Sequence, residues 1–414
     1  MSQNRDDFTR ELNCEQVLCV TRETLVDHFN MVVDGYTFDT EDIWHVVVAA
    51  SAEGQTIESA ANQLKDAPDS TTVRSYLRSK LLDSNTVRQL QATCNDAILA
   101  HLPPRISGYR HKVAIDLTYI PYHGQAGFDA NEIRRGQAKS GTTHFHCYAT
   151  AYVIKKNKRV TLAVYYVQAE ETMPEVLEWL LTRLNQIDVA IKRLYLDKQF
   201  YNVAVISHLQ THHPRLSVII PVIVRGKYGG TRALVKGRKS YNTTYTMHSA
   251  DHGQATFRIA VVCKYSKERY LRRGIAMFAY ALLGPGHIPL HQVYCEYRYR
   301  FGIEATYRLL NKVRARTTSR NPKLRLLYVA IALMLVNIWV YLKWNYLACP
   351  RRGGRKVWEA LFPLSLFKQF LLEAIKNIYG AVCVVSIPKT HCLRAIRENS
   401  QLLTTAWYVW YIFG

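Results

Sequence analysis

The sequence predicts a mixed α/β protein: one β-sheet covered by helices, with helical regions before and after it. Three observations predict this class. Between residues 110 and 224, strand-like segments rich in β-branched and tyrosine residues are followed by segments with helical spacing of apolar residues. The first hundred residues carry helical patterns alone. A hydrophobic content of 48% in 414 residues is enough for a large core.

The charge of the chain is strongly positive and unevenly distributed. It has 54 Lys and Arg against 32 Asp and Glu, a net charge of +22. Residues 1–100 contain 8 basic and 16 acidic side chains, a net charge of −8, so the other residues together carry +30. This excess indicates a polyanionic partner, either nucleic acid or an acidic membrane surface, and excludes an ordinary metabolic enzyme.

Residues 1–105 are expected to form a separate helical module. Helices are predicted at 42–50, 56–64 and 71–82, separated by Glu-Gly and Pro-Asp-Ser. This spacing suits a DNA-binding helix-turn-helix. The alternative is a small helical bundle used for dimer contacts. The last helix would present three basic side chains to DNA: Arg74, Arg78 and Lys80.

The central region, residues 106–224 with 287–345, is expected to carry the sheet. Three strands, a helix, a strand, a helix and a fifth strand are predicted in this order: 112–120, 143–154, 160–168, 174–187, 191–196, 202–210 and 216–224. This is the order of the ribonuclease H-like (retroviral-integrase-like) fold, a sheet with helices on both faces. Asp116 lies on the first strand and Asp197 ends the fourth. Nucleases of this fold hold two metal ions between carboxylates.

Residues 225–286 are predicted to be a β-rich insertion with basic loops. It begins RGKYGGTRALVKGRKS, which has six positive charges in 16 residues and no acid. A solvated loop is the alternative, but a basic run without a compensating acid favours a track for DNA phosphates. The candidate contacts are Arg225, Lys227, Arg232, Lys236, Arg238 and Lys239.

The segment YRYRFGIEATYRLLNK, residues 297–312, is predicted to be one helix with a polar stripe. Five side chains fall within about 80° of one another at 100° per residue. They are Tyr297, Arg300, Glu304, Arg308 and Asn311. A carboxylate flanked by guanidinium and phenol groups suits a metal ion bound beside phosphates. The alternative is a surface helix with an Arg300–Glu304 ion pair. Arg314 and Arg316 follow and are further candidate DNA contacts.

These residues resemble a known family. Asp116 in VAIDLTYIP, Asp197 in LYLDKQFYN and Glu304 in YRYRFGIEATYRLLNK resemble the DDE triad of prokaryotic insertion-sequence transposases. The chain is most similar to the group with a Tyr-x2-Arg-x3-Glu-x6-Lys (YREK) signature. Tyr297, Arg300 and Glu304 match that spacing, whereas the lysine position holds Asn311, with Lys312 beside it. The resemblance covers about residues 110–345.

The resemblance implies cut-and-paste DNA transposition of an insertion sequence. Asp116, Asp197 and Glu304 would be the catalytic residues and would bind Mg²⁺, for which Mn²⁺ substitutes. Strand cleavage through hairpin ends and strand transfer would follow. The implied partners are double-stranded DNA, as terminal inverted repeats and target DNA, and a second copy in a homodimer on DNA. No membrane is implied, and the expected location is the prokaryotic cytoplasm, at the nucleoid.

Two other functions are compatible with the same residues. One is a structure-specific nuclease on the ribonuclease H-like fold, which would cut DNA but never join a 3′-OH to a new strand. The other is a catalytically idle DNA-binding protein derived from a transposase. The presence of all three acids favours an active enzyme.

The C-terminal third contains two apolar segments. Residues 326–342 are nearly all apolar, and we expect a buried core helix, with a membrane span as the alternative. Within 346–414, the segment 356–379 has an apolar stripe that Pro363 is expected to break into two helices. This stripe is expected to contribute to a dimer, or else to pack against its own chain.

Cysteine and histidine spacing gives no zinc motif. Nine cysteines form no Cys-x2-Cys pair, which indicates reduced thiols in an intracellular protein. The polar N-terminus predicts no signal peptide. Pro289 separates His287 from His291, which favours loop histidines, and His212 with His213 is expected at a helix end.

Overall fold

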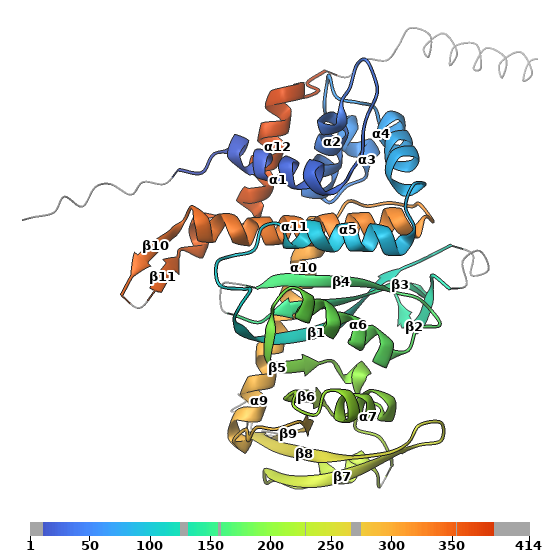
Figure 1. The fold of residues 1–414 in the computed structure, drawn as a ribbon, viewed down its shortest axis with the longest axis vertical. Helices are drawn as coiled ribbons and strands as arrows, with labels where there is room; N and C mark the ends of the chain where they lie inside the picture. Colours follow the sequence, from blue (N-terminus) through green and yellow to red (C-terminus); the bar gives the residue numbers. More distant parts are fainter. Residues whose placement is uncertain are drawn as a thin grey trace, which may run out of the picture.

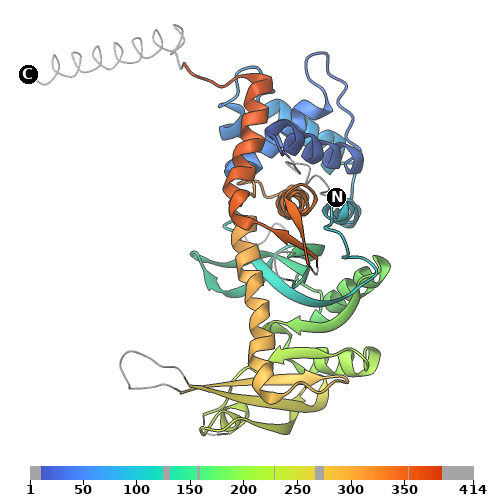
Figure 2. The same cartoon turned by 90° about the vertical axis from the view of Figure 1, so that its left-hand side faces the viewer.

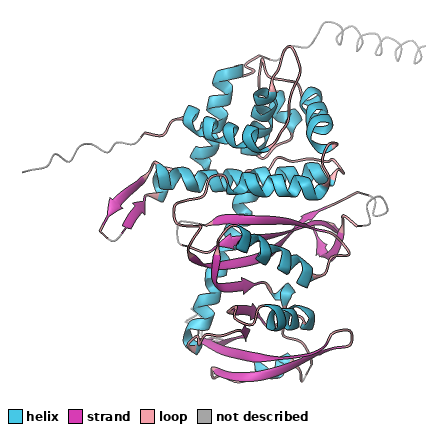
Figure 3. Ribbon diagram, viewed as in Figure 1, coloured by secondary structure: helices cyan, strands magenta, loops and turns pink. Residues whose placement is uncertain are grey.

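The computed structural model describes residues 11–124, 131–155, 159–227, 229–265, 275–352 and 354–384, with the backbone alone for 301–306. It is a mixed α/β protein with a central, mostly antiparallel sheet (Figure 1). Helices gather at the end that holds both described termini, and the rest of the structure combines the strands with helices packed beside them (Figure 3). The predicted α/β class and the helical regions on either side of the sheet are therefore present.

The elements follow in chain order. The helices are α1 (Cys14–His28), α2 (Thr40–Glu53), α3 (Ile57–Ala61), α4 (Ser70–Tyr76), α5 (Val87–Leu99), α6 (Met173–Gln186), α7 (Val203–His212), α8 (Thr231–Leu234), α9 (Leu290–Arg298), α10 (Gly302–Lys312), α11 (Pro322–Asn345) and α12 (Leu364–Tyr379). A π-helical turn follows α4 (Leu77–Leu82), and 3-10 turns lie at Lys198–Phe200, Tyr299–Phe301 and Glu359–Leu361. The strands are β1 (Arg110–Pro121), β2 (Arg134–Lys139), β3 (Thr142–Val153), β4 (Val160–Val167), β5 (Ala190–Leu196), β6 (Val218–Pro221), β7 (Tyr241–Ser249), β8 (Gly253–Tyr265), β9 (Ile275–Leu283), β10 (Ala348–Arg351) and β11 (Gly354–Val357).

Nine strands form one sheet within the described residues. Eight of them follow the order β2-β3-β1-β5-β6-β9-β8-β7. The ninth, β4, pairs with β3 alone. The pairs β1–β5 and β5–β6 are parallel, and the other pairs are antiparallel. The segment predicted as an insertion is β-rich, and its strands β7 to β9 continue the same sheet because β9 pairs with β6.

The outer edge of β4 is covered by side chains from two helices. Asn95 of α5 bonds both the N–H and the C=O of Val164, at 2.8 and 2.9 Å. Asn337 of α11 does the same for Thr161, at 3.0 and 2.8 Å, and also donates to the Ile98 carbonyl at 2.9 Å. Figure 1 shows α5 and α11 lying together along β4. These amides complete the hydrogen bonds of an edge strand that would otherwise be unpaired.

Replacing Asn337 with alanine should destabilise the fold strongly. The change leaves three backbone groups buried without partners, at Thr161 and Ile98. We expect the free energy of unfolding to fall by about 3 kcal/mol or more. Urea denaturation measures it, with the exposed Asn377 of α12, changed to alanine, as the control. Equal stability of the two variants would show that α11 does not hold β4 in this way.

The apolar stripe predicted at 356–379 packs within its own chain. The segment is broken at Pro363, as expected, and α12 begins at Leu364. Its buried side chains, Phe367, Leu371 and Ile375, belong to a core shared with α1, α2 and α11. The buried face of α12 therefore packs against its own chain, which was the alternative to a dimer contact.

Helix α11 is the central helix of that core. By length and composition it could cross a membrane, but 89% of its most apolar 18-residue window is buried against the rest of the chain. Lys343 at its end is also buried, with its ammonium 3.4 Å from the centre of the Trp339 ring. The packing is that of the core helix that the sequence analysis favoured.

Candidate active site

Sheet register brings two of the predicted acids together. β1 and β5 are parallel neighbours, and Ile115 pairs with Leu196. The residue after Ile115 is Asp116, on β1, and the residue after Leu196 is Asp197, directly after the end of β5. In parallel neighbours, residues at the same register point to the same side of the sheet, so the two carboxylates face a common space.

Arg300 bridges the two carboxylates. Its Nη2 lies 2.8 Å from Asp116 Oδ1 and 3.1 Å from Asp197 Oδ1. Only 11% of the Arg300 side chain and 10% of the Asp116 side chain are exposed. Beneath the guanidinium lies the buried ring of Tyr297, 5.7 Å away, whose hydroxyl donates to the Leu196 carbonyl at 3.1 Å. A buried pair of acids is thus held around one positive centre.

Burial dominates the electrostatics of this group. It raises the pKa of Asp116 to about 6, because a charged carboxylate loses its hydration there and because Asp197 repels it, although Arg300 opposes both effects. Burial also raises the pKa of the Tyr297 hydroxyl well above its usual value. A positive charge between the two aspartates therefore stabilises their ionised forms.

Helix α9, which ends just before this arginine, is anchored by Glu296. Glu296 of α9 accepts hydrogen bonds from Lys112 at 2.8 Å, Arg193 at 2.9 Å and the Tyr195 hydroxyl at 2.7 Å. These partners belong to β1 and β5, so α9 is tied to the two strands that carry the aspartates. Figure 2 shows α9 and α10 running along one side of the sheet.

The single helix predicted at 297–312 is wrong in one respect. α9 ends at Arg298, a 3-10 turn covers Tyr299–Phe301, and α10 begins at Gly302. Arg300 lies in this turn and makes ion pairs with both aspartates. Glu304 lies in the first turn of α10, and its side chain is outside the described residues.

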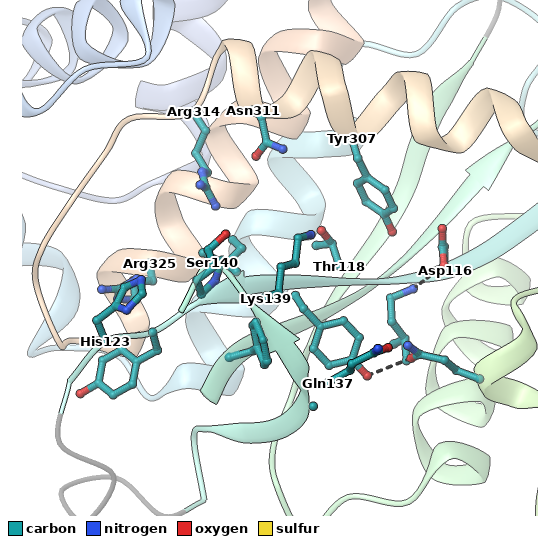
Figure 4. Close-up of a pocket in the computed structure, with 18 of the residues that line it drawn as sticks. Asp116, Thr118, His123, Gln137, Lys139, Ser140, Tyr307, Asn311, Arg314 and Arg325 are labelled. Carbon is teal, nitrogen blue, oxygen red and sulfur yellow. Dashed lines mark hydrogen bonds between the residues drawn. The ribbon is translucent and has the colours of Figure 1, made fainter. Parts of the chain in front are cut away.

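A cleft of about 1510 Å³ opens from the aspartates. Figure 4 shows Asp116 at one end and His123 with Arg325 at the other, with Tyr307, Asn311 and Arg314 pointing into the space between them. Several basic side chains line it: Lys139, Lys198, Arg300, Arg314, Arg316, Arg320 and Arg325.

Two arginines of the cleft are half-buried cations. Burial lowers the pKa of Arg314 and of Arg325, and neighbouring guanidinium groups lower that of Arg314 further. Within the described part of the chain, no carboxylate makes an ion pair with Arg314. A half-buried cation without an anion is costly, so the cleft is suited to an anion supplied from outside.

A second groove of about 590 Å³ continues the cleft toward the N-terminal helices. Arg316, Thr317 and Arg320 line both cavities. Arg74 and Arg78 line the second one, and they pair with Glu58 at 3.7 Å and Asp83 at 3.6 Å. The third predicted basic residue of this module, Lys80, pairs with Asp34 at 2.9 Å.

Several predicted DNA contacts lie outside the cleft. Arg308 and Lys312 are exposed on α10 and are not among the described residues that line it. The six basic residues of the predicted phosphate track are also exposed, between β6 and β7. They are Arg225, Lys227, Arg232, Lys236, Arg238 and Lys239. The structure places Tyr297, Arg300, Asn311, Arg314 and Arg316 around the cleft and the others elsewhere.

His146 is a buried residue of β3, and its ring makes an edge contact with that of Tyr122, which lines the cleft, at 5.1 Å between ring centres. Its Nδ1 donates to the Tyr166 hydroxyl at 3.0 Å, because that hydroxyl itself donates to the Glu132 carbonyl. Its Nε2 is buried with no hydrogen-bond partner among the described residues. Burial, with a smaller effect of Arg325, lowers the pKa of His146 to about 3.

This histidine should make the protein acid-sensitive. In the unfolded chain His146 is protonated as the pH falls below 6.5, whereas in the folded chain it stays neutral down to about pH 3. The free energy of unfolding therefore decreases as the pH falls through this window. Between pH 6.5 and 4.5 the loss should be about 2 kcal/mol. The difference in unfolding free energy between the wild type and His146→Gln, measured across this range, isolates the effect. Parallel pH profiles would contradict the assignment.

One side-chain cluster has no signature in the sequence. Among the described residues, Glu178, His208 and His213 form the one group of three that could hold a metal ion, with ligand atoms within 4.8 Å of one another. His212 ends α7 and His213 follows it, as expected. Glu178, which contacts both His208 and His213, lies 30 residues before His208, so no local motif could reveal the cluster.

Comparisons with known proteins give one kind of match. No family model matches the chain, and no curated protein sequence matches it. Among solved structures, the chain is similar to piggyBac transposase in its synaptic complex with hairpin DNA. The TM-score is 0.51 and the identity 12%, over 96% of this chain and 87% of that chain. The likeness therefore concerns the fold, and it extends over nearly the whole chain.

Proposed function

We propose that this chain is a DDE transposase of the YREK group, with a ribonuclease H-like catalytic core, that performs cut-and-paste transposition of an insertion sequence. The observation that carries the proposal is the pair Asp116 and Asp197. They follow paired positions on adjacent parallel strands and share one cation at the head of an arginine-lined cleft.

The fold supports the same proposal. The order of β1, β3, β4, α6, β5, α7 and β6 is the order expected for a ribonuclease H-like core. The similar solved structure is a transposase on hairpin DNA. Hairpin formation at the element ends is therefore the route that we propose for this chain.

The residues suit Mg²⁺, with Mn²⁺ as a substitute. Asp116, Asp197 and Glu304 would hold it. Oxygen ligands are those that Mg²⁺ prefers, and two carboxylate oxygens already converge on one positive group, Arg300 Nη2. When bound, the metal supplies Lewis-acid stabilisation of the attacking and leaving oxygens of the phosphodiester.

The other side chains position the DNA. Arg300 supplies positive charge between the aspartates, and a bound cation would take over that role and leave the guanidinium for the adjoining phosphate. Tyr297 supports Arg300 from below. Arg314 and Arg316 would neutralise phosphates along the cleft, and the exposed basic residues before β7 would extend this track.

Two copies are proposed to bridge two DNA ends, since both ends of a mobile element must be cut and joined together. Because the apolar face of α12 is buried within its own chain, the contact between copies would lie elsewhere.

Strand joining tests the proposal. The protein is incubated with Mg²⁺, a duplex carrying the DNA that borders its gene, and supercoiled plasmid. We expect a nick at the 3′ end of the element and then covalent linkage of that end to the plasmid. Cutting without joining would indicate the structure-specific nuclease instead. Binding with neither reaction would indicate the idle DNA-binding protein.

A further inference from the structure

A second cluster of metal-ligating side chains lies on the helices that cover one face of the sheet. α6 and α7 pack together on the same face (Figure 1). Glu178 projects from α6, His208 from α7, and His213 follows the end of α7. None of the three is among the described residues that line the cleft with Asp116.

The three side chains already converge on one point. Glu178 Oε2 lies 2.9 Å from His208 Nε2 and 2.7 Å from His213 Nε2. All three ligand atoms lie within 4.8 Å of one another. One carboxylate oxygen thus accepts hydrogen bonds from two imidazoles, and a cation placed there would replace the two shared protons.

Local backbone geometry builds this arrangement. Two histidines five positions apart on a continuous helix would point about 140° apart. Here the helix ends at His212, and His213 has φ −127° and ψ 50°, outside the helical region. The chain turns at that residue, which brings its ring back to the side of His208. Buried Ile206 and Leu209 hold α7 against the sheet, and Leu177 and Leu181 hold α6.

We propose that Glu178, His208 and His213 form a binding site for a divalent transition metal, of which Zn²⁺ is the best fit, and that the ion clamps α6 to the end of α7. Two imidazole nitrogens and one carboxylate oxygen are a zinc ligand set, and they exclude Mg²⁺ and Ca²⁺, which prefer all-oxygen sites. Three protein ligands leave the fourth position to water.

The geometry requires only a small adjustment. In a tetrahedral zinc site the donor atoms lie about 3.3 Å apart, so the nitrogens would each move about 0.5 Å from the carboxylate. The side chains are 42%, 19% and 25% exposed for Glu178, His208 and His213, which leaves the ion a path from solvent.

The test uses Zn²⁺ and Co²⁺ with the full chain, in excess Mg²⁺ so that the aspartate site is occupied. We expect one tight Zn²⁺ equivalent per chain, a rise in the melting temperature on its addition, and the intense visible absorption of four-coordinate Co²⁺ without a thiolate charge-transfer band. Glu178→Gln and His208→Asn should each weaken this equivalent by more than about 100-fold. Their circular dichroism without metal reports whether they fold.

His212 provides a matched control. Its ring lies 4.7 Å from that of His208, yet it is not one of the three ligands. His212→Asn should therefore leave the Zn²⁺ equivalent intact. The proposal fails if the wild type has no tight equivalent, or if His212→Asn weakens it as much as His208→Asn. It also fails if the Co²⁺ spectrum shows thiolate ligation, which would place the ion on the cysteines. Each of these results is independent of whether the chain cuts DNA.

Discussion

Replacing Asp116 or Asp197 with asparagine is expected to lower the rate of DNA strand cleavage by about 10³-fold or more, because several kcal/mol of transition-state stabilisation is lost with a metal ligand. DNA affinity should stay nearly unchanged, since neither carboxylate contacts a phosphate. The measurements are single-turnover cleavage of an end duplex with Mg²⁺ and a binding titration of the same duplex. Glu304→Gln is expected to behave in the same way.

Asp251 serves as the control for these variants. It is exposed in the turn between β7 and β8, so Asp251→Asn should cleave at the wild-type rate. Cleavage by Asp116→Asn within about tenfold of the wild type, a barrier change of little more than 1 kcal/mol, would remove Asp116 from the catalytic site.

The second large effect is expected from the arginines of the cleft. The double change Arg314→Gln with Arg316→Gln removes two cations that we assign to phosphates. Affinity for end DNA should fall by about 10- to 100-fold at physiological salt, and the slope of log affinity against log salt should become shallower by about two. Because Arg314 is a half-buried cation without an acidic partner among the described residues, the free variant should be at least as stable as the wild type.

Two exposed basic residues on another face provide the comparison. Arg215 and Lys192 are exposed and do not line the cleft. Changing both to glutamine removes the same charge and should affect the affinity only weakly. If both double variants weakened binding equally, net charge rather than the cleft would account for DNA affinity.

Runs of β-branched, tyrosine and other apolar residues made four strands of the sheet predictable. β1, β3, β4 and β5 lie within two residues of their predicted ends, because their buried apolar residues alternate or form short runs. β2 was missed because RRGQAK is almost entirely exposed and has no such pattern. The fifth strand was predicted at 216–224, but its ladder covers only Val218–Pro221.

Long-range pairing was the part that the sequence could not predict. The contact of β9 with β6 joins the predicted insertion to the central sheet. The bridge from Arg300 to both aspartates joins the 3-10 turn between α9 and α10 to two strands that lie more than 100 residues earlier in the chain. The contact of Glu178 with His208 and His213 was also not predictable, because the histidines lie on α7 and directly after it, whereas Glu178 lies on α6.

Most of the candidate site was nevertheless visible in the sequence. Asp116 lies within β1 and Asp197 directly follows β5, two strands that were predicted, and parallel pairing places the two residues side by side. The groove toward the N-terminal helices was not expected, because it forms where Arg316 and Arg320 meet the module that carries Arg74.

The most direct test of the central claim is a change of metal specificity. Asp116→Cys and Asp197→Cys each place a thiolate where we propose a metal ligand, and Mn²⁺ accepts sulfur more readily than Mg²⁺ does. Cleavage of an end duplex is measured for each variant in both metals, relative to the wild type. The account predicts no detectable cleavage with Mg²⁺ and partial recovery with Mn²⁺. Unchanged cleavage with Mg²⁺, or no recovery with Mn²⁺ in either variant while the wild type is active in both metals, would contradict it.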